Sequence, residues 1–135
     1  MKVVHLQPKI YENMSKEISF TIEHPVQAHE SALAMGSGDM EVFATPAMVA
    51  LMENAAAQAA KTVLDEGQTT VGTNIAVSHV KASRIGATVV ATAVLVQQEG
   101  RRLLFNVEAR DGEAVIGEGT HTRYIVEREK FLSKL

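Results

Sequence analysis

The stretch TPAMVALMENAAAQAAKTVL, residues 45–64, decides the fold. Pro46 suits the first turn of a helix, because its missing backbone N–H would be unpaired there anyway, and the Thr45 hydroxyl can cap the helix. Apolar side chains then follow on nearly all sides of the axis, which predicts a buried helix over residues 46–64. Gly67 suits the end of this helix, because glycine readily adopts the left-handed conformation found there.

The segment before the helix predicts one strand and a long loop. Residues 17–22 alternate, with Ile18, Phe20 and Ile22 on one face. Residues 23–44 show little periodicity and contain the breaker Gly36-Ser37-Gly38-Asp39. A loop of this length inside a compact domain is more often functional than idle.

The segment after the helix predicts four strands and a short terminal helix. The strands cover residues 71–80, 87–97, 101–110 and 114–126, and the helix residues 127–135. In the first strand one phase contains Val71, Thr73, Ile75 and Val77. The second strand is apolar in both phases, as expected for a strand covered on both faces.

Tight turns join these strands. Asp111-Gly112 is a strong hairpin signal, and Gln98-Glu99-Gly100 turns the chain between the two preceding strands. Gly117 and Gly119, in the last strand, suggest a bulge or a close approach of another backbone. Short connections of this kind require an antiparallel sheet.

An apolar helix followed by an antiparallel sheet predicts that the sheet curls around the helix. This is the hotdog fold of the α+β class, an antiparallel sheet wrapped around one long buried helix, here in a single domain over residues 1–135. One sheet can hardly cover such a helix completely, so we expect a homodimer. The sequence leaves open whether two dimers pair into a tetramer.

Composition excludes several classes of function. The 135 residues are 46% hydrophobic, enough for an ordinary core, and contain no cysteine, which excludes a cysteine nucleophile and a thiolate zinc site and fits a reducing cytoplasm. The net charge of −3 gives no general attraction to nucleic acid. Residues 1–14 contain no apolar run typical of a signal peptide, and residues 44–60 are interrupted by polar side chains. We therefore expect neither a secretion signal nor a membrane span.

Three residues could carry chemistry, and each has an ordinary alternative. Glu53 lies in the middle of the apolar helix, where a carboxylate is rarely buried unless it is paired; it could instead pair with a cation or face solvent. His79 shares the inward phase of its strand, although such a histidine is more often a hydrogen-bonded core or rim residue. Thr45 lies beside unpaired helical N–H groups that could stabilise an oxyanion, or it only caps the helix. Together they form a sensible acyl-transfer set, but their spacing alone does not place them together.

Six segments resemble the fluoroacetyl-CoA thioesterase family of hotdog proteins. They are VFATP (42–46), LME (51–53), GT (72–73), VSH (77–79), EGRRL (99–103) and IGEGTH (116–121). The resemblance extends from residue 17 to residue 131. Thr45 precedes Glu53 by eight positions and Glu53 precedes His79 by twenty-six, as in that family.

The resemblance implies an acyl-CoA thioesterase, which hydrolyses an acyl-CoA thioester to a carboxylic acid and free CoA. It implies a catalytic set of Thr45, Glu53 and His79, with Glu53 as nucleophile or as the base that activates water. It also implies that Gly72 helps to hold the thioester carbonyl and that Arg123 lies by the coenzyme or the site. No metal and no cofactor is implied, since coenzyme A is part of the substrate.

Several alternatives stay open at this stage. The chain could be a hotdog acyl-CoA hydratase or dehydratase, or an acyl-CoA binding module without catalysis. The resemblance also allows Thr45 and Glu53 to meet a His79 from the other subunit, without saying which chain contributes which residue. The long loop would correspond to the lid over the acyl pocket. The fluoroacetyl-specialised member has aromatic residues in that lid, whereas this chain has residues 36–39, GSGD, so we expect the chemistry to be kept and the fluoroacetyl preference to be absent.

Overall fold

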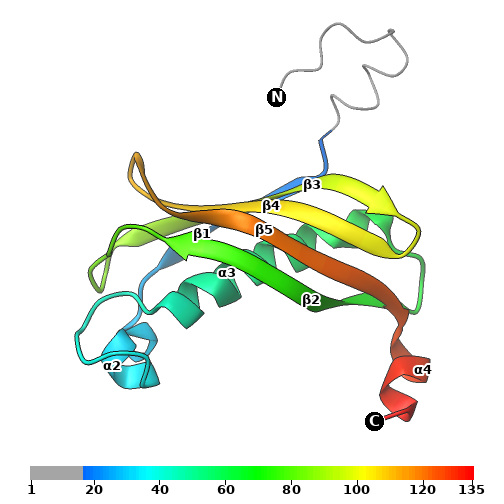
Figure 1. The fold of residues 1–135 in the computed structure, drawn as a ribbon, viewed down its shortest axis with the longest axis horizontal. Coiled ribbons are helices and arrows are strands. Elements are labelled where there is room, and N and C mark those ends of the chain that lie inside the picture. Colours follow the sequence, from blue (N-terminus) through cyan, green and yellow to red (C-terminus); the bar gives the residue numbers. More distant parts are fainter. Residues whose placement is uncertain (1–16) are drawn as a thin grey trace, which may run out of the picture.

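A five-stranded antiparallel sheet curves over one long helix, α3, in the computed structural model, which describes residues 17–135 (Figure 1). The strands lie in the order β1-β3-β4-β5-β2. Their bounds are β1 Ser19–Pro25, β2 Gln68–His79, β3 Thr88–Glu99, β4 Arg102–Asp111 and β5 Ala114–Glu127. Every neighbouring pair is antiparallel, as the tight turns predict.

The helices confirm the predicted order of elements. Helix α3 spans Thr45–Ala60 and continues as a 3-10 turn, η2, over Lys61–Val63. The terminal helix is α4, Arg128–Ser133. No helix within residues 17–135 is long and apolar enough to cross a membrane.

Helix α3 begins one residue earlier than predicted, and its cap differs from the prediction. Ala44 is the capping residue and offers no side-chain hydrogen bond, while Thr45 is the first helical residue and Pro46 follows it in the first turn. The prediction that Thr45 caps the helix is therefore wrong. Its hydroxyl is instead bonded to His79, on β2.

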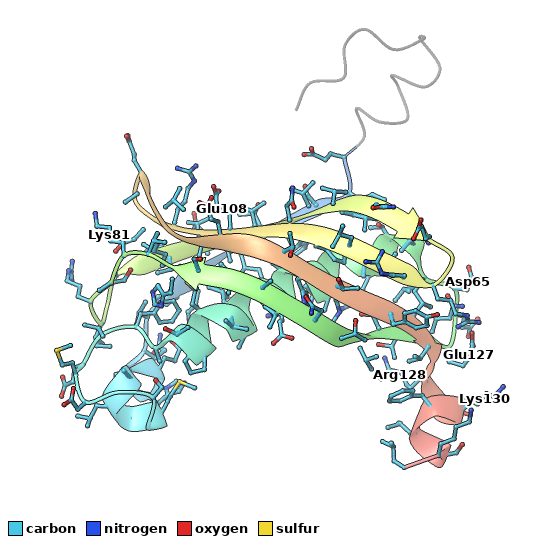
Figure 2. All side chains as sticks on the ribbon, viewed as in Figure 1. Asp65, Lys81, Glu108, Glu127, Arg128 and Lys130 are labelled. Atoms are coloured by element: carbon cyan, nitrogen blue, oxygen red, sulfur yellow. The ribbon has the colours of Figure 1, made fainter. Side chains whose placement is uncertain are left out.

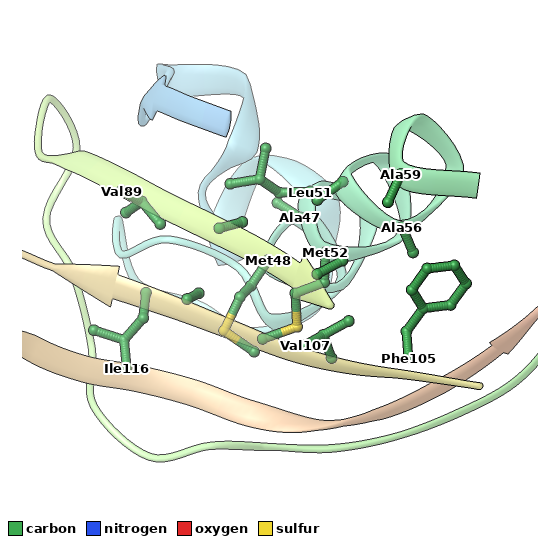
Figure 3. Packing of buried hydrophobic residues seen from close by; sticks show 14 of the residues in the cluster. Ala47, Met48, Leu51, Met52, Ala56, Ala59, Val89, Phe105, Val107 and Ile116 are labelled. Carbon is green, nitrogen blue, oxygen red and sulfur yellow. The ribbon is translucent and has the colours of Figure 1, made fainter. Parts of the chain in front are cut away.

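The core lies between α3 and the concave face of the sheet. Figure 3 shows Met48 and Met52 of α3 pointing toward Phe105, Val107 and Ile116 on β4 and β5. All five of these side chains are buried. Burying each large apolar side chain stabilises the fold by about 1.5–3 kcal/mol, so this contact fixes the helix on the sheet.

The sheet covers only one face of α3 within a single chain, which agrees with the expectation that one sheet can hardly cover this helix completely. The buried face consists of Ala47, Met48, Leu51, Met52, Ala55, Ala56, Ala59 and Ala60. The opposite face contains exposed Pro46 and Ala50 together with half-buried Val49, Glu53 and Ala57. That face is largely apolar and carries one carboxylate.

Strand β3 also differs from the prediction that both of its faces are covered. Val89, Ala91 and Ala93 are buried, but the alternate positions Val90 and Val94 are only half-buried. The apolar residues of the second phase therefore lie on the outer face of the sheet, where a single chain leaves them partly open.

A bulge in β2 changes the predicted phase of that strand. Gly72 pairs with Arg123 on β5, and the next regular pair is Asn74 with Thr122, so Thr73 is an extra residue. Val71 and Ile75 consequently belong to opposite faces, although the sequence pattern placed them together. The bulge places both Gly72 and His79 on the concave side, because two positions that are seven apart on a regular strand would lie on opposite faces.

The two glycines predicted to mark a bulge or a close approach in β5 do both. Register shifts by one residue between β4 and β5 next to Gly117. A Cβ at position 117 would lie 2.5 Å from Met48 Sδ, and one at position 119 would collide with the Ala76 carbonyl on β2. Glycine is therefore required where the helix and the neighbouring strand come closest to β5.

The predicted long loop is partly structured. Strand β1 extends to Pro25, and the 3-10 turn η1, Ala28–Glu30, and the short helix α2, Ala32–Met35, follow. Gly36 ends α2 in the left-handed conformation, with φ 75°. The segment around α2 lies at the end of the molecule where α3 begins (Figure 1).

Candidate active site

The first cluster joins Thr45, at the start of α3, to His79, at the end of β2. Thr45 Oγ1 and His79 Nδ1 form a hydrogen bond of 2.8 Å. Both residues line a cleft of about 260 Å³ that also contacts Ser37, Phe43 and Lys81. The loop before α3 therefore borders this cluster, as its length suggested.

The other nitrogen of His79 is chemically available. Nε2 is buried and has no hydrogen-bond partner among residues 17–135. Burial lowers the pKa of His79, since it disfavours the charged imidazolium. The imidazole is thus neutral near pH 7, and a buried polar atom without a partner is the kind of group that a bound ligand satisfies.

The second cluster surrounds Glu53, at the edge of α3 where its open face meets strands β2 and β5. Its carboxylate Oε2 lies 3.9 Å from His121 Nε2, and its side chain is 40% exposed. A Cβ at position 72 would lie 3.0 Å from Glu53 Oε2 and 3.3 Å from Arg123 Nη1. Gly72 therefore lets the carboxylate and the guanidinium approach the backbone of β2 more closely than a side chain would allow.

Arg123 is held in place by three hydrogen bonds. Its Nε donates to Thr70 Oγ1 at 2.8 Å and its Nη2 to the Thr70 carbonyl at 3.1 Å. Its Nη1 lies 3.1 Å from His121 Nε2. Burial lowers the pKa of Arg123, and the nearby Glu53 charge opposes this shift. A fixed cation thus lies next to the carboxylate of the second cluster.

The predicted residues fall into these two clusters within one chain. The structure brings Thr45 to His79, and it brings Glu53 to Gly72 and Arg123. It does not bring Glu53 to the Thr45–His79 pair, because eight helical residues separate positions 45 and 53 by about 12 Å along the axis. One chain therefore contains two partial sites on one helix.

Positive charge is available near both ends of the sheet. Figure 2 shows Lys81 at the end where α2 lies, and Arg128 and Lys130, both in α4, at the opposite end. Lys81 also lines the cleft of the first cluster. Arg101 and Arg102 instead form salt bridges. Arg101 Nη2 lies 3.5 Å from Glu127 Oε2, and Arg102 Nη1 lies 3.7 Å from Glu99 Oε1.

Two residues of the second cluster had no role assigned from the sequence. Thr70 precedes Gly72 by two positions, and His121 precedes Arg123 by two. Side chains two positions apart on a strand share a face. The proximity of His121 to Arg123 is therefore a signal that the sequence contained, whereas the contact with Thr70 depends on how β2 and β5 pair.

Comparison with known proteins places the chain in a family. Residues 26–129 match the model described as "FlK: Fluoroacetyl-CoA-specific thioesterase". The chain belongs to the fluoroacetyl-CoA-specific thioesterase family. A fluoroacetyl-CoA thioesterase from Streptantibioticus cattleyicolor is 47% identical to it over 95 residues, which cover 70% of this chain and 68% of that protein.

Solved structures confirm the hotdog fold of this family member. A structure of the fluoroacetyl-CoA thioesterase FlK superposes with a TM-score of 0.80 and 40% identity, over 86% of this chain and 90% of that one. A variant of that thioesterase has been solved in complex with fluoroacetate and CoA. A hot-dog-like protein from Thermanaerovibrio acidaminovorans matches with a TM-score of 0.79 at 19% identity, over 87% of each chain, and shows the fold alone.

The stability of this family member should fall as the pH drops below about 6.5, the usual pKa of histidine in an unfolded chain. Burial lowers the pKa of both His79 and His121 in the folded state. At His121 the charge of Arg123 lowers the pKa further, whereas the Asn74 carbonyl and Glu53 raise it. The unfolded chain then binds protons that the folded chain excludes, so the stabilisation is complete above the unfolded pKa and is lost below it.

Melting temperatures measured between about pH 8 and pH 5.5 check this expectation. In the double variant His79→Gln/His121→Gln, the melting temperature should change less with pH over that range than in the wild type. An unchanged slope in the double variant would mean that other groups cause the effect.

Proposed function

We propose that this protein hydrolyses acyl-CoA thioesters to a carboxylic acid and free CoA, and that it acts as a homodimer in the cytoplasm. Its family is one of acyl-CoA thioesterases. The observation that carries the proposal is the Glu53 carboxylate, which is partly exposed at the edge of the open face of α3, beside Gly72 and the fixed cation of Arg123. The absence of cysteine fits a reducing compartment.

Glu53 can serve the reaction in two ways. As a nucleophile, its carboxylate attacks the thioester carbonyl carbon, the C–S bond breaks, the CoA thiolate leaves, and water then hydrolyses the mixed anhydride. As a general base, it takes a proton from the water that attacks the same carbon. We assign Gly72 to hold the thioester carbonyl, because a residue without a side chain lets a carbonyl approach the β2 backbone closely. Arg123 lies near Gly72 and Glu53, where its charge can stabilise the oxygen as it becomes negative.

His79 and Thr45 suit the proton transfers of this reaction. A neutral imidazole with one unpartnered nitrogen can accept a proton from water and return one to the thiolate. Thr45 fixes the orientation of that imidazole through the bond to Nδ1. We assign them as the acid–base group and its positioning partner.

The two partial sites become one site if a second copy covers the open face of α3. The face around Glu53 is apolar at Pro46, Val49, Ala50 and Ala57 and is left uncovered by its own sheet. Antiparallel packing of two α3 helices about a two-fold axis would bring Glu53 of one chain toward the Thr45–His79 pair of the other. This arrangement supplies the complete set that a single chain separates by about 12 Å.

Measurement of free thiol separates this function from the two alternatives. A hydratase or dehydratase of the same fold changes the acyl chain and releases no thiol. A binding module has affinity for CoA esters and forms no product. Thiol release from a panel of acyl-CoA esters therefore identifies hydrolysis, and it also identifies the preferred acyl group.

Replacing Glu53 by alanine should lower thioesterase kcat by at least about 100-fold, the usual scale for loss of a positioned acid or base. The variant should fold, because the side chain is 40% exposed. Asn54→Ala, the neighbouring exposed position on α3, is the matched control and should keep near-wild-type kcat. Wild-type turnover in a folded Glu53→Ala protein contradicts the assignment.

Mixing Glu53→Ala with His79→Ala protein should restore activity when subunits exchange. If each site takes Glu53 from one chain and His79 from the other, every hybrid dimer contains one intact site, and an equal mixture reaches about one quarter of wild-type activity. Self-contained sites predict no recovery at all. A fully active monomer in sedimentation would also contradict the shared site.

Fluoroacetyl-CoA and acetyl-CoA should be hydrolysed with kcat/KM values within about tenfold of each other. Residues 31–42 around α2 contain no aromatic side chain, and Phe43 after them is buried. The flexible exposed side chains there are Leu33, Met35 and Met40. A fluoroacetyl preference of several orders of magnitude would show that selectivity in this chain does not depend on an aromatic lid.

A further inference from the structure

We propose that His121 is a positioning residue for thioester hydrolysis, holding the Arg123 guanidinium beside Glu53 without letting the two close into an ion pair. This inference rests on the proposed function, since it concerns the same carboxylate. It assigns to a buried histidine a role separate from that of His79.

The contacts of His121 determine which nitrogen carries the proton. Nδ1 lies 2.7 Å from the Asn74 carbonyl oxygen, which can only accept a hydrogen bond, so Nδ1 is the protonated nitrogen. Nε2 of a neutral ring then carries a lone pair and accepts the hydrogen bond from Arg123 Nη1 at 3.1 Å. A second proton on Nε2 would point one N–H at another, so the contact requires the neutral ring.

The His121 ring is buried in this network. His121 is only 1% exposed and lies on β5 beside the buried Phe105 of β4. Asn74 follows the bulge at Thr73, where the regular pairing of β2 with β5 is interrupted. The carbonyl that orients the ring is therefore fixed by the backbone.

His121 and Thr70 together hold Arg123 away from a direct pair with Glu53. Thr70 binds two groups of the guanidinium, Nε and Nη2, and His121 binds the third, Nη1. No ion pair between Arg123 and Glu53 occurs within residues 17–135, although Glu53 is close enough to raise the pKa of Arg123 against the effect of burial. Without the His121 acceptor, Nη1 would be free to bond the carboxylate.

Such a bond would reduce the reactivity of Glu53. Charge-assisted hydrogen bonds to arginine occupy the same lone pairs that a nucleophile or base must use. The arrangement with His121 keeps the positive charge near the reacting carbonyl while the carboxylate oxygens stay free. His121 therefore acts through Arg123; its own Nε2 lies 3.9 Å from Glu53 Oε2, which is beyond hydrogen-bond distance.

Two amide variants separate this role from a merely structural one. In His121→Gln the side-chain amide reaches the place of Nε2, where its oxygen can accept from Arg123, but it leaves the Asn74 carbonyl without its donor. In His121→Asn the amide nitrogen takes the place of Nδ1 and can donate to Asn74, but it does not reach Arg123. His121→Gln thus keeps the contact with Arg123, and His121→Asn keeps the contact with Asn74.

We expect thiol-release kinetics with acetyl-CoA to show kcat at least about tenfold lower for His121→Asn than for His121→Gln, with a smaller change in KM. Equal kcat values, or a better His121→Asn enzyme, overturn the inference, because they would show that the bond to Asn74 is what matters. A wild-type protein that releases no thiol from any acyl-CoA ester refutes the proposed function itself.

The ring of the wild-type protein gives a second test that needs no variant. Nitrogen NMR shifts of His121 at pH 7 should show a neutral imidazole protonated on Nδ1, with an Nε2 lone pair in a hydrogen bond. A charged ring, or a proton on Nε2, overturns the inference even if neither variant folds. This result does not depend on whether the protein is an active thioesterase.

Discussion

The packing of α3 against the concave face of the sheet is the contact on which the rest of the structure depends. Met48 and Met52 fill the space between helix and sheet, and alanines make up most of the remaining contact surface. Small side chains bring the helix close to the sheet, and Gly117 removes the atom that would keep Met48 away from β5. The same closeness fixes the height at which Glu53 lies above Gly72, so the geometry of the site follows from the packing of the core.

The sequence predicted the fold well because the fold rests on periodicity. One segment was apolar around a helical axis, and five others alternated or were continuously apolar at strand length, which allowed few arrangements. The errors concern features that periodicity does not contain. The sequence does not reveal the bulge at Thr73, because Val71, Thr73 and Ile75 alternate as residues on one face of a regular strand do. Incomplete coverage of α3 was expected, but the sequence did not show which of its faces stays open, because apolar residues do not indicate whether the same chain or a second one covers them.

The site was predictable in its members but not in its geometry. Thr45, Glu53, His79, Gly72 and Arg123 were selected by residue type and family resemblance. Their division into two clusters depends on the length of α3 between positions 45 and 53, and this becomes clear only when the helix is laid on the sheet. His121 was overlooked because a buried histidine is usually structural, and its particular hydrogen bonds depend on the carbonyl of Asn74 across the strand pair.

The bulge at Thr73 has a consequence for how this chain can vary. Gly72 belongs to the cluster around Glu53, and His79 belongs to the cluster around Thr45. A loss or gain of one residue between them would leave β2 long enough to pair with β5, yet it would turn one of the two clusters to the outer face of the sheet. The length of this short segment, as much as the identity of its residues, is therefore under constraint. A substitution in this segment is tolerated as long as the new side chain packs well. Insertion or deletion of an odd number of residues keeps the sheet but separates the catalytic residues.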